Sequence, residues 1–167
     1  SRRQRQMCIR DRHAADYKIP FAIHLGDIVD QQGKPAQWEI ADAAMQVLED
    51  AEVPYSILAG NHDVIRDVDY VNAGSQSTDT DAQRTLANEP YLKWFPTTRS
   101  ARQATFGGRD SSGFHEFHIF EAEGQSFLVL SLSWRVSDAG LDWARQVLAQ
   151  HPTPVSYTHL TLPTTPY

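Results

Sequence analysis

The chain has 167 residues, a formal net charge of −6 and one cysteine, Cys8. Five arginines and one acidic residue lie within residues 1–12, so residues 13–154 carry 10 basic and 20 acidic side chains and a net charge of −10. This acidic balance argues against nucleic acid as the main partner, because binding to a polyanion usually shows as a basic patch. No stretch approaches the roughly 20 consecutive apolar residues of a membrane-spanning helix.

The two ends of the chain are related through their coding sequence. Residues 7–11, MCIRD, can be written in codons whose reverse complement encodes VSYTH, the sequence of residues 155–159. The complementarity extends over twelve consecutive residue pairs, which chance would rarely produce. Both ends resemble a transposase adaptor read in opposite orientations. We therefore expect residues 1–12 and 155–167 to be adaptor-like and not native, and residues 13–154 to be one truncated domain.

The first half of the chain predicts a strand, a helix and a second strand. Residues 19–25, IPFAIHL, form an apolar run that ends at a glycine, as buried strands do. Residues 35–51 place apolar side chains at helical spacing, and Pro35 suits the first turn of a helix. Residues 53–60, VPYSILAG, read as a second buried strand. This order predicts a βαβ unit with parallel strands and a right-handed crossover.

Residues 64–113 are rich in Asp, Ser, Thr, Gly and Arg, and predict a long loop with one short helix near 80–88. Long loops in compact domains are usually functional or mobile, so we expect this segment to form a wall or lid.

The last third of the chain predicts a hairpin and a helix. Residues 113–132 read as two antiparallel strands that turn at Gly124. Residues 137–150, SDAGLDWARQVLAQ, read as a helix with Ser137 or Asp138 as its N-cap.

Polar residues follow both predicted parallel strands. Gly26-Asp27-Ile28-Val29-Asp30 comes directly after the first strand, and Gly60-Asn61-His62-Asp63 directly after the second. Ligands bind beyond the carboxyl ends of parallel strands, and the two glycines permit a tight exit of the backbone there. An Asp carboxylate can bridge two cations, an Asn carbonyl is a neutral ligand, and His can ligate metals or transfer protons. Such an arrangement is typical of metal-assisted phosphoryl transfer.

These two motifs, 34 residues apart, resemble the GDxxD and GNHD motifs of the calcineurin-like metallophosphoesterases. The later segment FHIFEAEGQSFLVLSL is similar to secreted bacterial members, which favours a secreted or periplasmic protein. The resemblance covers nearly all of residues 13–154. It implies an α/β fold, a four-layer αββα sandwich with mixed sheets, here lacking the first strand and the C-terminal part.

The resemblance also implies roles for individual residues. Asp27 would bridge two divalent metal ions, such as Mn, Fe or Zn, and Asn61 would be a ligand of the second ion. His62 would protonate the leaving oxygen or stabilise its developing charge, and Asp63 would orient His62. The implied partner is a phosphorylated small-molecule substrate, and monoester, diester and pyrophosphate substrates all stay open.

Other motifs of the family do not occur within residues 13–154. The family has an Asp-x-His at the end of an earlier strand, and a lone His and a Gly-His-x-His after a helix like that ending near residue 150. Asp11-Arg12-His13 and Thr158-His159 match parts of these motifs, but both depend on adaptor-like residues. We therefore expect the intact protein to be the enzyme and the truncated domain to be inactive. The alternative is a non-catalytic binding domain that retains the fold.

The remaining polar candidates have simpler structural interpretations. Asp30 is more simply a capping group or a residue that supports the metal ligands. Arg99 and Arg102 are candidate substrate-binding residues, because a guanidinium fits a phosphate, although solvated loop arginines are common. Three histidines are more simply core residues than ligands: His24, His115 and His118.

Overall fold

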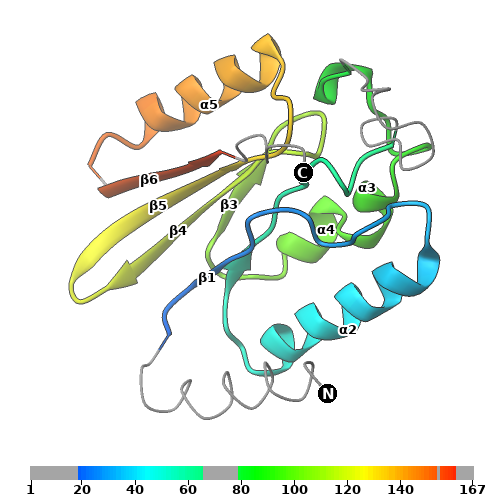
Figure 1. Ribbon diagram of the computed structural model, residues 1–167. Helices are drawn as coiled ribbons and strands as arrows, with labels where there is room; N and C mark the ends of the chain where they lie inside the picture. The colour runs from blue at the N-terminus through cyan, green and yellow to red at the C-terminus, as the bar shows by residue number, and fades with distance from the viewer. Residues whose placement is uncertain (1–18, 66–78, 154, 161–167) are drawn as a thin grey trace, which may run out of the picture.

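The computed structural model describes residues 19–65, 79–153 and 155–160, with side chains described as far as residue 153 (Figure 1). The helices and strands, in chain order, are β1 (Ala22–Ile23), α2 (Pro35–Asp50), β2 (Tyr55–Ser56), the 3₁₀ helix η1 (Asp81–Gln83), α3 (Pro90–Trp94), α4 (Thr97–Ser100), β3 (Phe106–Arg109), β4 (Glu116–Ala122), β5 (Gln125–Leu132), α5 (Asp138–Gln150) and β6 (Val155–Leu160). Among these residues, no helix is long and apolar enough to cross a membrane.

The predicted βαβ unit is confirmed. β1 and β2 pair in parallel, and α2 connects them. Pro35 occupies the first turn of α2, where its missing N–H would have no helical partner in any case. The helix buries one face, which consists of Trp38, Ala41, Met45 and Leu48. Both strands are two residues long, shorter than predicted. Beyond β2 the backbone N–H groups of Ile57 and Ala59 donate to side chains instead of to a neighbouring strand.

The second sheet has the strand order β3-β4-β5-β6. β4 pairs antiparallel with β3 and β5, whereas β6 pairs in parallel with β5. The predicted hairpin is confirmed: Ala122 faces Gln125 across a turn in which Glu123 has φ 51° and Gly124 φ 75°. Two-residue turns with positive φ match the twist of a hairpin, and Gly adopts this conformation without strain. β6 lies within the segment that we expect to be adaptor-like.

The two faces of the second sheet contact different partners. Phe117 and the alternate leucines of β5 pack against α5, whereas His118 and Phe120 of β4 point toward the β1 side. There the ring of Phe21 lies 4.7 Å from that of Phe120. In Figure 1, α5 lies on one side of the four-stranded sheet and α2 on the outer side of the β1–β2 pair. The layers therefore run helix, sheet, sheet, helix, as in the predicted αββα sandwich.

The described part of the long segment after β2 is more regular than predicted. The expected helix near residues 80–88 is the three-residue η1, and α3, α4 and β3 follow it. Their helices have only four or five residues, too few to show a helical period in the sequence. Tyr91, Leu92 and Phe95 join the core formed by α2 and β2, so this segment is packed into the domain. The helix α5 begins as predicted, with the Ser137 hydroxyl accepting the N–H of Gly140.

Candidate functional site

The turns that follow β1 and β2 lie directly against each other. A Cβ atom on Gly60 would lie 2.2 Å from Asp27 Oδ1 and 2.4 Å from the Asp27 backbone nitrogen, so only glycine fits there. Asp27 Oδ1 also accepts the backbone N–H of His62 at 3.2 Å. Asp27 has φ 51°, a left-handed conformation that non-glycine residues seldom adopt outside strained or functional turns. The structure thus brings together the two motifs that the sequence singled out.

The Asp63 side chain connects the two turns through hydrogen bonds to the backbone of each. Its side chain is fully buried; Oδ1 accepts the N–H of Val29 at 2.9 Å and Oδ2 accepts the N–H of Gly60 at 2.8 Å. Each carboxylate oxygen therefore binds the backbone of a different turn. Burial raises the pKa of Asp63 to about 7, although these hydrogen bonds act in the opposite direction.

The ring of His62 is oriented by Asp30. His62 Nδ1 lies 2.8 Å from the Asp30 carbonyl oxygen, and the Asp30 carboxylate is 3.9 Å away. A carbonyl only accepts hydrogen bonds, so Nδ1 carries the proton of the neutral ring and Nε2 is its basic nitrogen. We expected Asp63 to orient this ring, but its carboxylate bonds to the backbone of Val29 and Gly60 instead. Asp30 contacts His62, and its role in supporting a metal ligand stays a prediction.

The residues at this junction fit a divalent metal centre. Asp27 is exposed, and Asn61 and His62 are partly exposed, so ions can reach them from solvent. Carboxylate, amide and imidazole donors together suit Mn²⁺, Fe²⁺ or Zn²⁺. The space left by the missing side chain of Gly60 lets the Asp27 carboxylate lie against the second turn. Of the partial motifs at the chain ends, residues 11–13 lie outside the described residues, and only the backbone of His159 is described.

Arg99 is buried away from solvent in an ion-pair network with α2. Its guanidinium donates to Asp42 and to Glu49, each at 2.6 Å, and lies over the ring of Phe95. Its side chain is 7% exposed. The substrate-binding prediction for Arg99 is therefore wrong. Its guanidinium is paired with carboxylates of α2 and connects α4 to that helix. Arg102 is exposed, and its role in substrate binding stays a prediction.

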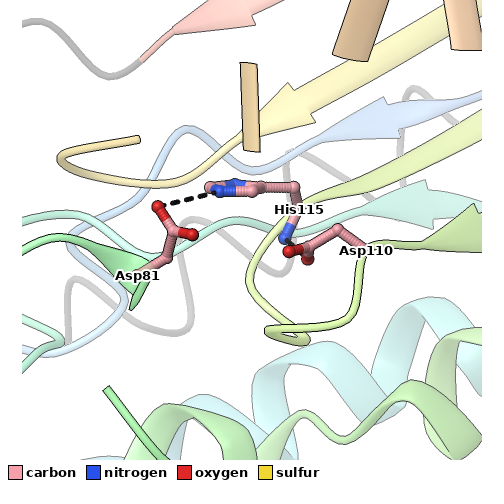
Figure 2. Close-up of side chains that lie close together, drawn as sticks. All are labelled: Asp81, Asp110 and His115. Atoms are coloured by element: carbon pink, nitrogen blue, oxygen red, sulfur yellow. Dashed lines mark hydrogen bonds and ion pairs between the residues drawn. The ribbon is translucent and has the colours of Figure 1, made fainter. Parts of the chain in front are cut away.

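A second polar cluster joins the segment after residue 79 to α5 and β4. The ligand-type atoms of Asp81, Asp110 and His115 all lie within 4.8 Å of one another, so this group could hold a metal ion (Figure 2). Asp81 accepts hydrogen bonds from the backbone and hydroxyl of Ser137 at the start of α5. Burial raises the pKa of Asp81, but His115 and these hydrogen bonds outweigh it and lower the pKa to about 2.

The existing contacts of His115 oppose metal binding in this cluster. Its Nδ1 accepts the N–H of Ser133 at 3.1 Å, so the neutral ring carries its proton on Nε2 and offers no lone pair there. Nε2 lies 3.4 Å from Asp81 Oδ1 and packs closely against Gly140, where a Cβ would be only 2.7 Å away. His115 is fully buried, as is His118, which confirms the core interpretation of these two histidines.

Sequence reasoning missed Glu116 and Ser133, which hold the backbone between β2 and the second motif. Glu116 Oε1 accepts the N–H of Ile57 at 2.8 Å, and Ser133 Oγ accepts the N–H of Ala59 at 2.9 Å. The available signal was a polar residue at the end of a strand with several apolar residues, namely Glu116 at the start of β4 and Ser133 directly after β5. A buried polar group requires a partner, which here is the backbone of another element.

Comparisons with known proteins identify the family of the chain. A family model described as calcineurin-like phosphoesterase matches residues 3–165, and the chain therefore belongs to that family. It is 30% identical over 134 residues to the uncharacterized protein YvnB of Bacillus subtilis (strain 168). The match covers 80% of this chain and 9% of the Bacillus protein, so the chain spans about a tenth of that relative's length. Membership in the family supports metal-dependent hydrolysis of phosphoesters in general.

Proposed function

We propose that the intact protein containing residues 13–154 hydrolyses phosphoesters at a dinuclear metal site built on Asp27 and the Asn61-His62 turn. The contact between the two motif turns carries this proposal: Asp27 Oδ1 accepts the His62 N–H, and Gly60 leaves room for that carboxylate. The remaining ligands would come from motifs of the intact protein beyond residues 13–154. The substrate class is a phosphorylated small molecule.

Each residue of the junction has a distinct role in this proposal. Two divalent ions, when bound, supply neutralisation of the phosphoryl charge and a nucleophile at neutral pH. The Asp27 carboxylate, at the end of β1, and the side-chain oxygen of Asn61 would hold these ions. His62 keeps Nδ1–H on the Asp30 carbonyl, so Nε2 would first take up a proton from solvent; the imidazolium would then deliver that proton to the leaving oxygen and return to the neutral ring. Asp63 fixes the distance between the two turns.

Hydrolysis by the full-length gene product tests the proposal. Purified protein is assayed with Mn²⁺ on an aryl phosphate monoester, an aryl phosphodiester and a nucleotide pyrophosphate. Asp27→Asn should remove most of the rate on the preferred substrate. The matched control is Asp142→Asn, an exposed Asp on α5 whose ion pair with Arg145 lies on the surface. An unchanged rate for Asp27→Asn would overturn the assignment, and no hydrolysis by the wild type would favour a binding domain.

A further inference from the structure

The backbone that leads into the second motif is held mainly by side chains of other elements. Residues 57–59 are fully buried and continue the direction of β2 after its ladder with β1 has ended. The N–H of Ile57 donates to Glu116, and its carbonyl accepts from the Tyr91 hydroxyl at 3.2 Å. This segment is therefore placed by residues that come from distant parts of the chain.

Ala59 is held on both sides by two consecutive residues that follow β5. Its N–H donates to Ser133 Oγ at 2.9 Å, and its carbonyl accepts the N–H of Trp134 at 2.8 Å. Ala59 directly precedes Gly60, and Asn61 follows one residue later. A shift of Ala59 would therefore move the proposed metal ligand with it.

The Ser133 hydroxyl is itself fixed in direction. It is 1% exposed, its proton goes to the Phe114 carbonyl at 2.6 Å, and its lone pair accepts the Ala59 N–H. The backbone N–H of Ser133 donates to His115 Nδ1 at 3.1 Å. A hydroxyl has one proton to donate, and because Phe114 takes it, the oxygen can only accept from Ala59.

Ser131 provides an internal comparison. It lies two residues earlier in β5 and is fully buried, but its hydroxyl has no hydrogen-bond partner among the described residues. Burial of a serine in this part of the chain thus does not by itself place its hydroxyl on the backbone that leads into the motif. The contact from Ser133 to Ala59 is specific to that position.

We propose that Ser133 is a positioning residue for the metal-binding turn, which it holds in place through Ala59. The proposal rests on the function proposed above, because it takes Asn61 as a metal ligand. Outer residues that orient metal ligands typically change metal affinity or activity about 10- to 100-fold when they are removed. Ser133 lies one step further out, since it acts on the backbone that carries the ligand.

The test compares Ser133→Ala with Ser131→Ala in the full-length gene product. Ser133→Ala should raise the Mn²⁺ concentration for half-maximal rate by about 10-fold or more. At saturating Mn²⁺ it should change KM little. It should also speed hydrogen exchange of the Ala59 amide. Ser131→Ala, which removes a buried hydroxyl without a described partner, should leave the Mn²⁺ dependence and this exchange unchanged. A Ser133→Ala protein with a lower Tm but wild-type Mn²⁺ dependence would overturn the proposal.

A second variant and an amide-exchange measurement on the wild type keep the proposal testable if Ser133→Ala does not fold or if hydrolysis is not observed. If Ser133→Ala does not fold, Ser133→Cys replaces it, because a thiol is a weaker acceptor, and the same change in Mn²⁺ dependence is expected. In the wild type, Mn²⁺ should slow exchange of the Ala59 amide, since coupling between ligand and segment is reciprocal. Mn²⁺ binding without any change at Ala59 would contradict the proposal. Mn²⁺ binding without hydrolysis would overturn only the proposed function.

Discussion

Arg109 in β3 and Glu116 in β4 form a fully buried ion pair across neighbouring strands of the second sheet. Arg109 Nη2 lies 2.7 Å from Glu116 Oε2, and the two side chains are 1% and 0% exposed. The same carboxylate accepts the Ile57 N–H beyond β2 and the hydroxyl of Ser100 in α4. Arg109 also donates to two backbone carbonyl oxygens, so both charges have several partners. The pair thereby connects the second sheet to the strand that leads to the site.

Removing one member of this pair should destabilise the domain strongly. Glu116→Ala leaves the Arg109 guanidinium buried without its countercharge, and such losses typically amount to about 3–5 kcal/mol. Urea denaturation of the variant and the wild type measures the difference in free energy of unfolding. Arg145→Ala, which removes an exposed ion pair on α5, is the control and should change stability by no more than the error of the method. A small loss for Glu116→Ala would show that the interior tolerates the lone charge.

Stability should fall in acid because of the same carboxylate. Burial raises the pKa of Glu116, but the charge of Arg109 and the contact with His118 outweigh it and lower the pKa from 4.5 to about 2. A folded-state pKa below the unfolded value favours folding while the group is charged. The contribution is therefore complete above about pH 4.5 and lost as pH falls toward 2. Glu116→Gln should flatten the decline in thermal stability between these pH values, and an unchanged decline would assign it to other groups.

Gly60→Ala should disturb the junction of the two turns. The added Cβ would lie 2.2 Å from Asp27 Oδ1, so either the carboxylate or the turn must move. Overpacking of this kind typically destabilises a protein by about 1–3 kcal/mol. Gly33→Ala is the matched control, because nothing lies within 4 Å of its added Cβ. Denaturation and Mn²⁺ dependence of the rate are measured for both variants, and equal behaviour would contradict close packing at Gly60.

Arg99 and Arg102 should differ in their effects when each is replaced by alanine. Arg99→Ala loses hydrogen bonds to Asp42 and Glu49, and should lower stability by about 2 kcal/mol without a selective effect on KM. Arg102→Ala should leave stability unchanged. If Arg102 contacts substrate, the KM of the Arg102→Ala variant should rise more for charged substrates than for a generic aryl phosphate. Equal KM changes for both substrate types would remove Arg102 from the substrate site.

Residues 1–167 alone should bind metal weakly. At positions that match the family motifs, residues 13–154 supply only Asp27, Asn61 and His62, and so few ligands leave most of the coordination to water. Calorimetric titration with Mn²⁺ should show much weaker binding than the full-length gene product does. Stoichiometric, micromolar binding of two ions with turnover would show that the expected domain boundaries are wrong.

Local sequence patterns predicted the βαβ unit, the hairpin and the two motifs, because each depends on residues close together in the chain. The contacts that position the second motif could not be predicted in this way. Glu116 lies 59 residues from Ile57, and Ser133 lies 74 residues from Ala59. Their partners are backbone groups, which any residue offers, so the sequence does not reveal which ones they bind. The contacts of Arg99 could not be predicted either, because its acidic partners lie on a helix about 50 residues earlier in the chain.

The packing of Gly60 against Asp27 restricts position 60 whatever side chain position 27 carries. An added Cβ would lie 2.2 Å from the Asp27 carboxylate and 2.4 Å from the Asp27 backbone nitrogen, so loss of the carboxylate alone would not free the position. The close approach of the two turns therefore preserves the glycine by itself. A lineage that abandoned metal chemistry could lose the aspartate and still retain the glycine, as long as the surrounding sandwich persists.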